Sequence, residues 1–156
     1  MCGIVAVTGY KKALPLLING LEKLEYRGYD SAGIAIINSE TNFISCNKAK
    51  GKLKNLISNL NDHNIPGTVG IGHTRWATHG KPEVKNAHPH TDSSGNIAVV
   101  QNGIIENFQD LKNKLEEEGI IFNSDTDTEV IPHLIQRELN TLSKLNLENN
   151  GSTLLV

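Results

Sequence analysis

The amino-acid sequence predicts a layered fold of the α/β or α+β class. Short apolar segments typical of buried strands alternate with segments whose leucines recur at helical spacing. The 156 residues suffice for one domain, and a domain of that size buries roughly 68–70% of its unfolded surface. The hydrophobic content of 38% is that of an ordinary globular protein. Alternating helices and strands favour sheets covered by helices.

The first 60 residues predict the order strand, helix, strand, strand, helix. These elements span Gly3–Val7, 14–24, Ile34–Ile37, Phe43–Ser45 and 53–60. Pro15 is compatible with its helix only in the first turn, where a backbone N–H is not needed. Gly28 is a stop signal after that helix, and the polar residues 38–42 form a turn between the two strands.

The rest of the chain predicts two strands, a helix, a short strand and a final helix. These elements span Val69–Gly72, Ile97–Val100, 108–115, Ile120–Phe122 and 130–142. The first two are nearly all apolar, so we expect them to be buried on both faces. Thr126 followed by Glu129 is a capping-box pattern for the final helix. Pro132 predicts that this helix begins late or bends.

Charge and composition exclude several classes of function. With 15 Lys+Arg against 17 Asp+Glu, the chain has no basic excess to hold a nucleic acid. No apolar run approaches the roughly 20 residues of a membrane span, and the start does not resemble a signal peptide. We therefore expect a cytoplasmic protein without a disulfide between Cys2 and Cys46. Cys46 is predicted to be a small buried residue.

Cys2 is the most informative residue in the sequence. Once Met1 is removed, Cys2 carries a thiol and a free α-amine on the same residue. The amine has a pKa of about 7.7–8.0 and can accept the thiol proton near neutral pH. This combination points to acyl transfer by a nucleophile that brings its own base. The alternative is a chain that merely begins with Met-Cys.

Two loops hold residues that are unusual for simple turns. Residues 25–33 combine two tyrosines, an arginine and an aspartate, although a solvated loop would explain them as well. Residues 73–80 follow an apolar strand and place Arg75 beside Trp76, the only tryptophan. The planar guanidinium of an arginine can bind a carboxylate through two hydrogen bonds. A surface arginine packed on a tryptophan is the alternative.

Four histidines close together in the sequence raise the question of a metal site. They are His73, His79, His88 and His90. Their spacing does not match the H-E-x-x-H motif, and no cysteine pair accompanies them. We therefore predict no metal site.

Two further segments can bind parts of a polar substrate. The amide of Asn102 and the backbone N–H of Gly103 follow a buried strand and can form an oxyanion hole, although Asn-Gly is also a turn signal. Asp127 can accept a substrate ammonium group or can simply belong to a helix cap. Together with Cys2 and Arg75, these groups suit a free amino acid whose side chain ends in an acyl group.

Six motifs, in this order, resemble the glutaminase domain of the glutamine–fructose-6-phosphate aminotransferase (glucosamine-6-phosphate synthase) family, whose members are class II glutamine amidotransferases. The motifs are Met1–Val5, Tyr26–Gly33, His73–Gly80, Asn86–His90, Asn102–Asn107 and Thr126–Glu129. The resemblance implies an α+β fold of the N-terminal-nucleophile hydrolase type. In this fold two stacked antiparallel sheets lie between helical layers, as a four-layer αββα sandwich.

The resemblance also implies the catalytic residues. Cys2 attacks the side-chain amide of L-glutamine, with its own α-amine as the base. Asn102 and the Gly103 N–H hold the oxyanion, and Arg27 helps to orient the terminus. Ammonia leaves, and water then hydrolyses the thioester.

The substrate-binding residues follow from the same motifs. Arg75 takes the α-carboxylate of glutamine and Asp127 takes its α-ammonium group. Trp76, Thr78 and His79 belong to a loop that closes over the substrate. The resemblance implies no metal and no organic cofactor, and in the whole family enzyme the ammonia passes to domains that bind fructose 6-phosphate.

The chain departs from the family in two respects. Gln101 stands where the family commonly has histidine. The family's glutaminase domain also continues past residue 156, so we expect residues 1–145 to be a partial, C-terminally incomplete type 2 amidotransferase domain. We also expect residues 146–156 to form a divergent tail and the sugar-isomerase domains to be absent. Two functions stay open: an enzyme fragment, completed if needed by a separate chain, or an inactive remnant that serves in binding or assembly.

Overall fold

The computed structural model describes residues 2–60, 65–76, 81–145 and 154–155. The strands are β1 (Gly3–Val7), β2 (Ser31–Ile37), β3 (Ile44–Lys50), β4 (Gly70–Arg75), β5 (His90–Thr91), β6 (Ile97–Val99) and β7 (Leu154–Leu155). The helices are α1 (Ala13–Leu24), α2 (Leu53–Asn59), α3 (Phe108–Glu117) and α4 (Val130–Leu145), with short 3-10 turns η1 (Glu25–Arg27), η2 (Val84–Asn86) and η3 (Asp127–Glu129).

The first sheet has four antiparallel strands in the order β1-β4-β2-β3. β2 lies inside this sheet, and its Ala, Gly and Ile residues are almost entirely buried, as expected for a strand covered on both faces. The register places Gly3 opposite Thr74. The start of β1 therefore lies beside the end of β4, and this arrangement brings Cys2 close to Trp76.

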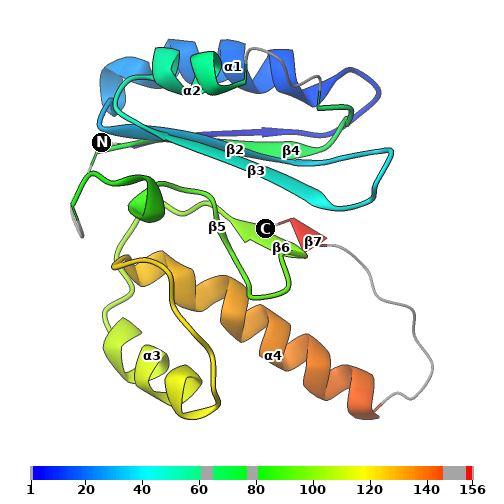
Figure 1. Cartoon of the computed structure of the whole chain (residues 1–156), viewed down its shortest axis with the longest axis vertical. Helices are drawn as coiled ribbons and strands as arrows, with labels where there is room; N and C mark the ends of the chain where they lie inside the picture. The colour runs from blue at the N-terminus through cyan, green and yellow to red at the C-terminus, as the bar shows by residue number, and fades with distance from the viewer. Residues whose placement is uncertain (1, 61–64, 77–80, 146–153, 156) are drawn as a thin grey trace.

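Helices α1 and α2 cover the outer face of this sheet (Figure 1). α1 buries Ala13, Leu17 and Leu21, whose spacing of four residues places them on one side of the helix. They pack with Ile34 and other side chains of the sheet in the main hydrophobic core. Pro15 is the third residue of α1, in the first turn where proline is tolerated.

The second half of the chain forms the other two layers. β5, β6 and β7 make a three-stranded sheet, in which β5 and β6 are antiparallel whereas β6 and β7 are parallel. This sheet lies between the first sheet and the helices α3 and α4 (Figure 1). The arrangement is the expected four-layer αββα sandwich, except that the β6–β7 pair breaks the expected antiparallel pattern.

The two halves approach each other closely at Gly33. A Cβ atom on this residue would lie 2.2 Å from the carbonyl oxygen of His88. Only glycine fits this contact, because any side chain would push the segment before β5 away from β2. The segment of residues 88–89 therefore packs directly on the first sheet.

Three expectations about local structure are wrong. Ile120–Phe122 is not a strand, and Ile121 is 77% exposed. Thr126 is predicted to cap the final helix, but it precedes the short turn η3 and makes no side-chain cap, and Glu129 binds the N–H groups of residues 123 and 124 instead of completing a capping box. Cys46 is exposed rather than buried.

The final helix settles the question raised by Pro132. α4 begins at Val130, so Pro132 lies in the first turn, and the helix runs on to Leu145. Across the described ranges, no helix is both long enough and apolar enough to cross a membrane.

Candidate active site

A cavity of about 510 Å³ opens where the end of β4, the residues after β6 and the turn η3 meet. Its volume is within the range of small-molecule sites, which is about 300–1,000 Å³. Every site residue predicted from the sequence that the structure describes lines this cavity. These residues are Cys2, Arg27, Arg75, Trp76, Asn102, Gly103 and Asp127. Thr78 and His79 lie outside the described residues.

The Cys2 thiol lies against the end of β4. The backbone N–H of Trp76 donates a hydrogen bond to the Cys2 Sγ at 3.2 Å, and Sγ lies 3.5 Å from the Trp76 carbonyl oxygen. This hydrogen bond fixes the position of the sulfur beside the last residue of β4. Cys2 is half-buried and not bonded to another cysteine, so the sulfur can meet a substrate in the cavity.

Asn102 binds Cys2 from the opposite half of the molecule. Its Nδ2 donates to the backbone oxygen of Cys2 at 3.3 Å, and its Oδ1 lies 2.9 Å from Nε2 of His73. Asn102 and Gly103 come after β6, so the two sheets contribute facing parts of the same cavity.

Two oppositely charged side chains line this cavity. Arg75, at the end of β4, is 4% exposed, and Asp127, in η3, is 5% exposed. Asp127 Oδ2 accepts the backbone N–H of Ile105 at 2.7 Å, which fixes the carboxylate at the cavity wall. A buried cation and a buried anion in one cavity suit a ligand that itself carries both charges, such as an amino acid.

The loop around Arg27 packs against the strand that carries Arg75. A Cβ atom on Gly28 would lie 2.7 Å from the Arg75 carbonyl carbon, so the loop needs glycine there. The backbone N–H of Asp30 donates to the Arg75 carbonyl oxygen at 3.1 Å. The Tyr29 and Trp76 rings are nearly perpendicular, with their centroids 5.1 Å apart. These contacts hold the loop around Arg27 against the end of β4.

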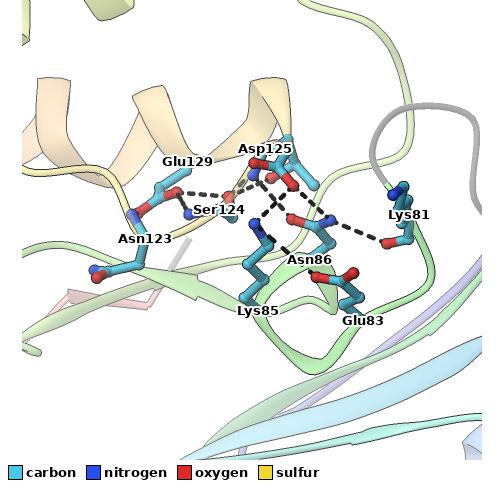
Figure 2. A network of polar contacts seen from close by, with 9 residues as sticks. Lys81, Glu83, Lys85, Asn86, Asn123, Ser124, Asp125 and Glu129 are labelled. Atoms are coloured by element: carbon cyan, nitrogen blue, oxygen red, sulfur yellow. Dashed lines mark hydrogen bonds and ion pairs between the residues drawn. The ribbon is translucent and has the colours of Figure 1, made fainter.

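A polar network holds the loop that precedes Asp127 (Figure 2). The fully buried Asn86 accepts the backbone N–H of Asp125 at 2.8 Å. Its Nδ2 donates to the Asp125 carboxylate at 3.2 Å and to the Lys81 carbonyl oxygen at 3.0 Å. Lys85 adds an exposed ion pair with Asp125 at 2.9 Å. The asparagine therefore ties residues 81–86 to the loop that positions Asp127.

Glu129 stabilises the same loop from the other side. Its carboxylate accepts the backbone N–H groups of Asn123 and Ser124 at 2.8 and 2.7 Å (Figure 2). Burial opposes its ionisation, but His133 at 3.7 Å and the hydrogen bonds from Asn123 and Ser124 outweigh burial and lower the pKa of Glu129 from 4.5 to about 2. The carboxylate thus holds residues 123 and 124, which lie just before the turn that carries Asp127.

Three of the four clustered histidines form a buried stack beside the cavity. The His73 and His88 rings are parallel at 4.3 Å, and His88 meets His90 edge-on at 4.7 Å. Burial lowers the pKa of His73 to about 4 and that of His90 to about 3, so both are neutral at pH 7. Among the described residues, no three His, Cys, Asp or Glu side chains are grouped as metal ligands.

Sequence reasoning missed the supporting roles of Asn86, Glu129 and His73. Asn86 belongs to one of the six motifs, but its partner lies 39 residues further on, and no local pattern reveals that contact.

Gln101, which stands where the family commonly has histidine, accepts a hydrogen bond from the Thr128 hydroxyl at 3.0 Å. The Gln101 side chain thus links the segment that carries Asn102 and Gly103 to the turn that carries Asp127.

The sequence profile of the glutamine amidotransferase domain matches residues 46–146. A glutamine–fructose-6-phosphate aminotransferase [isomerizing] from Gloeobacter violaceus is 62% identical over 136 residues, covering 86% of this chain and 22% of the relative. The enzyme of that name from Pyrococcus horikoshii is 57% identical over 139 residues, covering 89% of this chain and 23% of the relative. The chain thus spans about a fifth of the length of these curated relatives.

Two solved structures share the fold. Glutamine phosphoribosylpyrophosphate amidotransferase from B. subtilis, in complex with ADP and GMP, is 32% identical with a TM-score of 0.72 over 88% of this chain and 29% of its own. An allosteric regulatory enzyme of purine biosynthesis is 32% identical with a TM-score of 0.74, over 88% of this chain and 30% of its own. With the profile match over most of the sequence, these likenesses show that the chain belongs to the glutamine amidotransferase family and has the N-terminal-nucleophile fold.

Proposed function

We propose that this chain binds L-glutamine and hydrolyses its side-chain amide, releasing ammonia through a thioester on Cys2. The observation that carries the proposal is the composition of one cavity. Cys2, Asn102, Arg75 and Asp127 line it together, and these are the groups needed for attack, oxyanion stabilisation and recognition of both charged ends of an amino acid.

In the proposed reaction the Cys2 sulfur attacks the amide carbon and forms a C–S bond. The α-amine of Cys2 takes the thiol proton and passes it to the departing nitrogen, so that ammonia leaves. The Asn102 amide and the Gly103 N–H donate hydrogen bonds to the oxyanion of the tetrahedral intermediate. A water molecule then attacks the thioester, which releases glutamate and restores the thiol.

This mechanism requires a free amine on Cys2, so we propose that Met1 is removed. A peptide nitrogen between Met1 and Cys2 could not accept the thiol proton at neutral pH. Arg27 lines the cavity with Cys2, and we propose that it orients the new terminus. Trp76, Thr78 and His79 are proposed to belong to the loop that closes over glutamine.

The relatives suggest the fate of the ammonia. They are glutamine–fructose-6-phosphate aminotransferases, and the chain spans about 22% of their length. We propose that the ammonia aminates fructose 6-phosphate in sugar-isomerase domains outside the 156 residues, which a separate chain could also supply. The division at residues 145 and 146 and the cytoplasmic location stay predictions.

The test measures ammonia and glutamate released from glutamine by the 156-residue chain, together with its intact mass. We expect loss of one methionine and turnover that disappears in Cys2→Ala. Cys2→Ala should still bind glutamine, which shows that the variant is folded. Retention of Met1 in active protein would contradict the amine mechanism. A folded wild-type chain without turnover would instead favour the inactive remnant.

A further inference from the structure

The Asn102 side chain can help or oppose the proposed reaction, depending on which end of its amide faces Cys2. The Nδ2 end donates hydrogen bonds and stabilises an oxyanion, whereas the Oδ1 end carries partial negative charge and repels it. The two ends have nearly the same shape, so packing alone selects poorly between them. A hydrogen-bond partner on the far side of the amide is therefore decisive.

His73 is that partner. Its Nε2 lies 2.9 Å from Asn102 Oδ1, while Asn102 Nδ2 lies 3.3 Å from the backbone oxygen of Cys2. An amide oxygen only accepts hydrogen bonds, so Nε2 of His73 must carry a proton. The neutral imidazole has one N–H, and this contact fixes it on Nε2.

The surroundings of His73 hold the ring in place. The residue lies in β4 opposite Ile4 of β1 and Gly33 of β2, so both neighbouring strands fix its backbone. Its side chain is 1% exposed and stacks on the His88 ring at 4.3 Å. Burial keeps the ring neutral, with a pKa of about 4. The N–H donor is therefore present over the whole physiological pH range.

We propose that His73 is a positioning residue, whose Nε2–H binds Asn102 Oδ1 and turns the Asn102 amide donor toward the substrate at Cys2. The proposal rests on the proposed function, because the oxyanion arises only if Cys2 attacks glutamine. It gives the buried histidine a role in the transition state and none in binding the charged ends of the substrate.

The size of the effect follows from the donor that is lost. Complete removal of one oxyanion-hole donor lowers kcat by about 10²–10³-fold. An amide without its anchor still faces the substrate correctly part of the time, so we expect a smaller loss of about 10–100-fold. The KM for glutamine and the inhibition constant for glutamate should change by less than about threefold, because neither depends on the oxyanion donor.

The experiment compares His73→Gln with His73→Leu in the full chain. The glutamine amide nitrogen can occupy nearly the position of Nε2 and donate to Asn102, whereas leucine fills the space without a donor. We expect the loss of kcat in His73→Leu and recovery to within about threefold of wild type in His73→Gln. Equal losses in both variants, unchanged kcat in His73→Leu, or a rise in KM as large as the loss of kcat would overturn the proposal.

A measurement without turnover tests the same contact. Nitrogen NMR of the wild-type chain should show His73 neutral with its proton on Nε2 at pH 6 and pH 8, and Asn102→Ala should shift that proton's resonance. A proton on Nδ1, or a resonance unchanged in Asn102→Ala, would overturn the proposal even if a variant fails to fold. Absence of ammonia release by the wild-type chain, with the expected NMR result, would refute the proposed hydrolysis and leave the His73–Asn102 contact established.

Discussion

Lowering the pH from 8 to 5 should destabilise the chain by about 2 kcal/mol through His73 alone. Burial lowers the pKa of this histidine from 6.5 to about 4 in the folded state. As the pH falls, His73 is protonated near pH 6.5 in the unfolded chain but only near pH 4 in the folded chain. The contribution of neutral His73 to the free energy of unfolding is therefore present above pH 6.5 and is lost as the pH falls from 6.5 to about 4.

The magnitude follows from the two pKa values. One pKa unit corresponds to about 1.36 kcal/mol, and pH 5 lies about 1.5 units below the unfolded value, which gives about 2 kcal/mol. His88 and His90 stack in the same cluster, and burial lowers their pKa values in the same direction. Arg75 and Lys48 act on this cluster as nearby positive charges and favour its neutral form. The total loss for the chain should therefore exceed the share of His73.

Urea unfolding, followed by circular dichroism at pH 8, 7, 6 and 5, measures the effect. A typical domain has a free energy of unfolding of about 5–15 kcal/mol, so a loss of 2 is readily detected. In His73→Gln the difference between pH 8 and pH 5 should shrink by about 2 kcal/mol. The reasoning fails if wild type and His73→Gln depend on pH equally, or if the wild-type chain gains stability on acidification.

The remaining predictions concern substrate binding and the contact between the two halves. Arg75→Ala should weaken glutamine binding by about 10–150-fold, the equivalent of the 1.5–3 kcal/mol typical of hydrogen bonds to a charged group, as calorimetry would show. Asn86→Ala frees the loop before Asp127 and should also raise the glutamine Kd, without changing the alkylation rate of Cys2 by iodoacetamide. Gly33→Ala should lower the melting temperature, because its Cβ would lie 2.2 Å from the His88 carbonyl oxygen.

Each of these predictions has an outcome that contradicts it. Tight glutamine binding by a folded Arg75→Ala variant would refute the role of Arg75 in binding the α-carboxylate. If Cys2 of Asn86→Ala is alkylated more slowly while the variant binds glutamine normally, Asn86 supports the thiol of Cys2 and not the position of Asp127. A Gly33→Ala protein as stable as wild type would show that the segment at His88 moves aside at no cost.

The sequence predicts the first helix and the central strands of the first sheet well because these elements have simple hydrophobic patterns. The spacing of the leucines identifies α1, and the apolar runs identify β2 and β4. The short strand predicted at residues 120–122 is wrong because apolar character alone does not supply a pairing strand. Ile121 is exposed, the Ile120 N–H bonds the Leu115 carbonyl oxygen at the end of α3, and Glu129 binds the N–H groups of the two residues that follow the segment.

The candidate site likewise contains residues that the sequence reveals and residues that only the structure reveals. Cys2, Arg75, Asn102 and Asp127 are recognisable because each has a chemical group suited to one part of glutamine, and all line one cavity. The supporting residues have no such signature. In the sequence His73 is one of four clustered histidines whose spacing fits no metal motif, and only its distance of 2.9 Å from Asn102 suggests a role for it.

The cavity depends on how the two halves of the sandwich are held together. Cys2, His73 and Arg75 belong to the first sheet or its immediate neighbours, whereas Asn102 and Asp127 belong to the second half. An amino acid held by Arg75 and Asp127 would span both halves, so their separation would determine the length of substrate that reaches the sulfur. The hydrogen bonds of Asn102 to Cys2 and His73 cross this boundary, as does the close contact of Gly33 with the second half. Substitutions at these crossing contacts should therefore alter the reaction more than equally buried substitutions within either half.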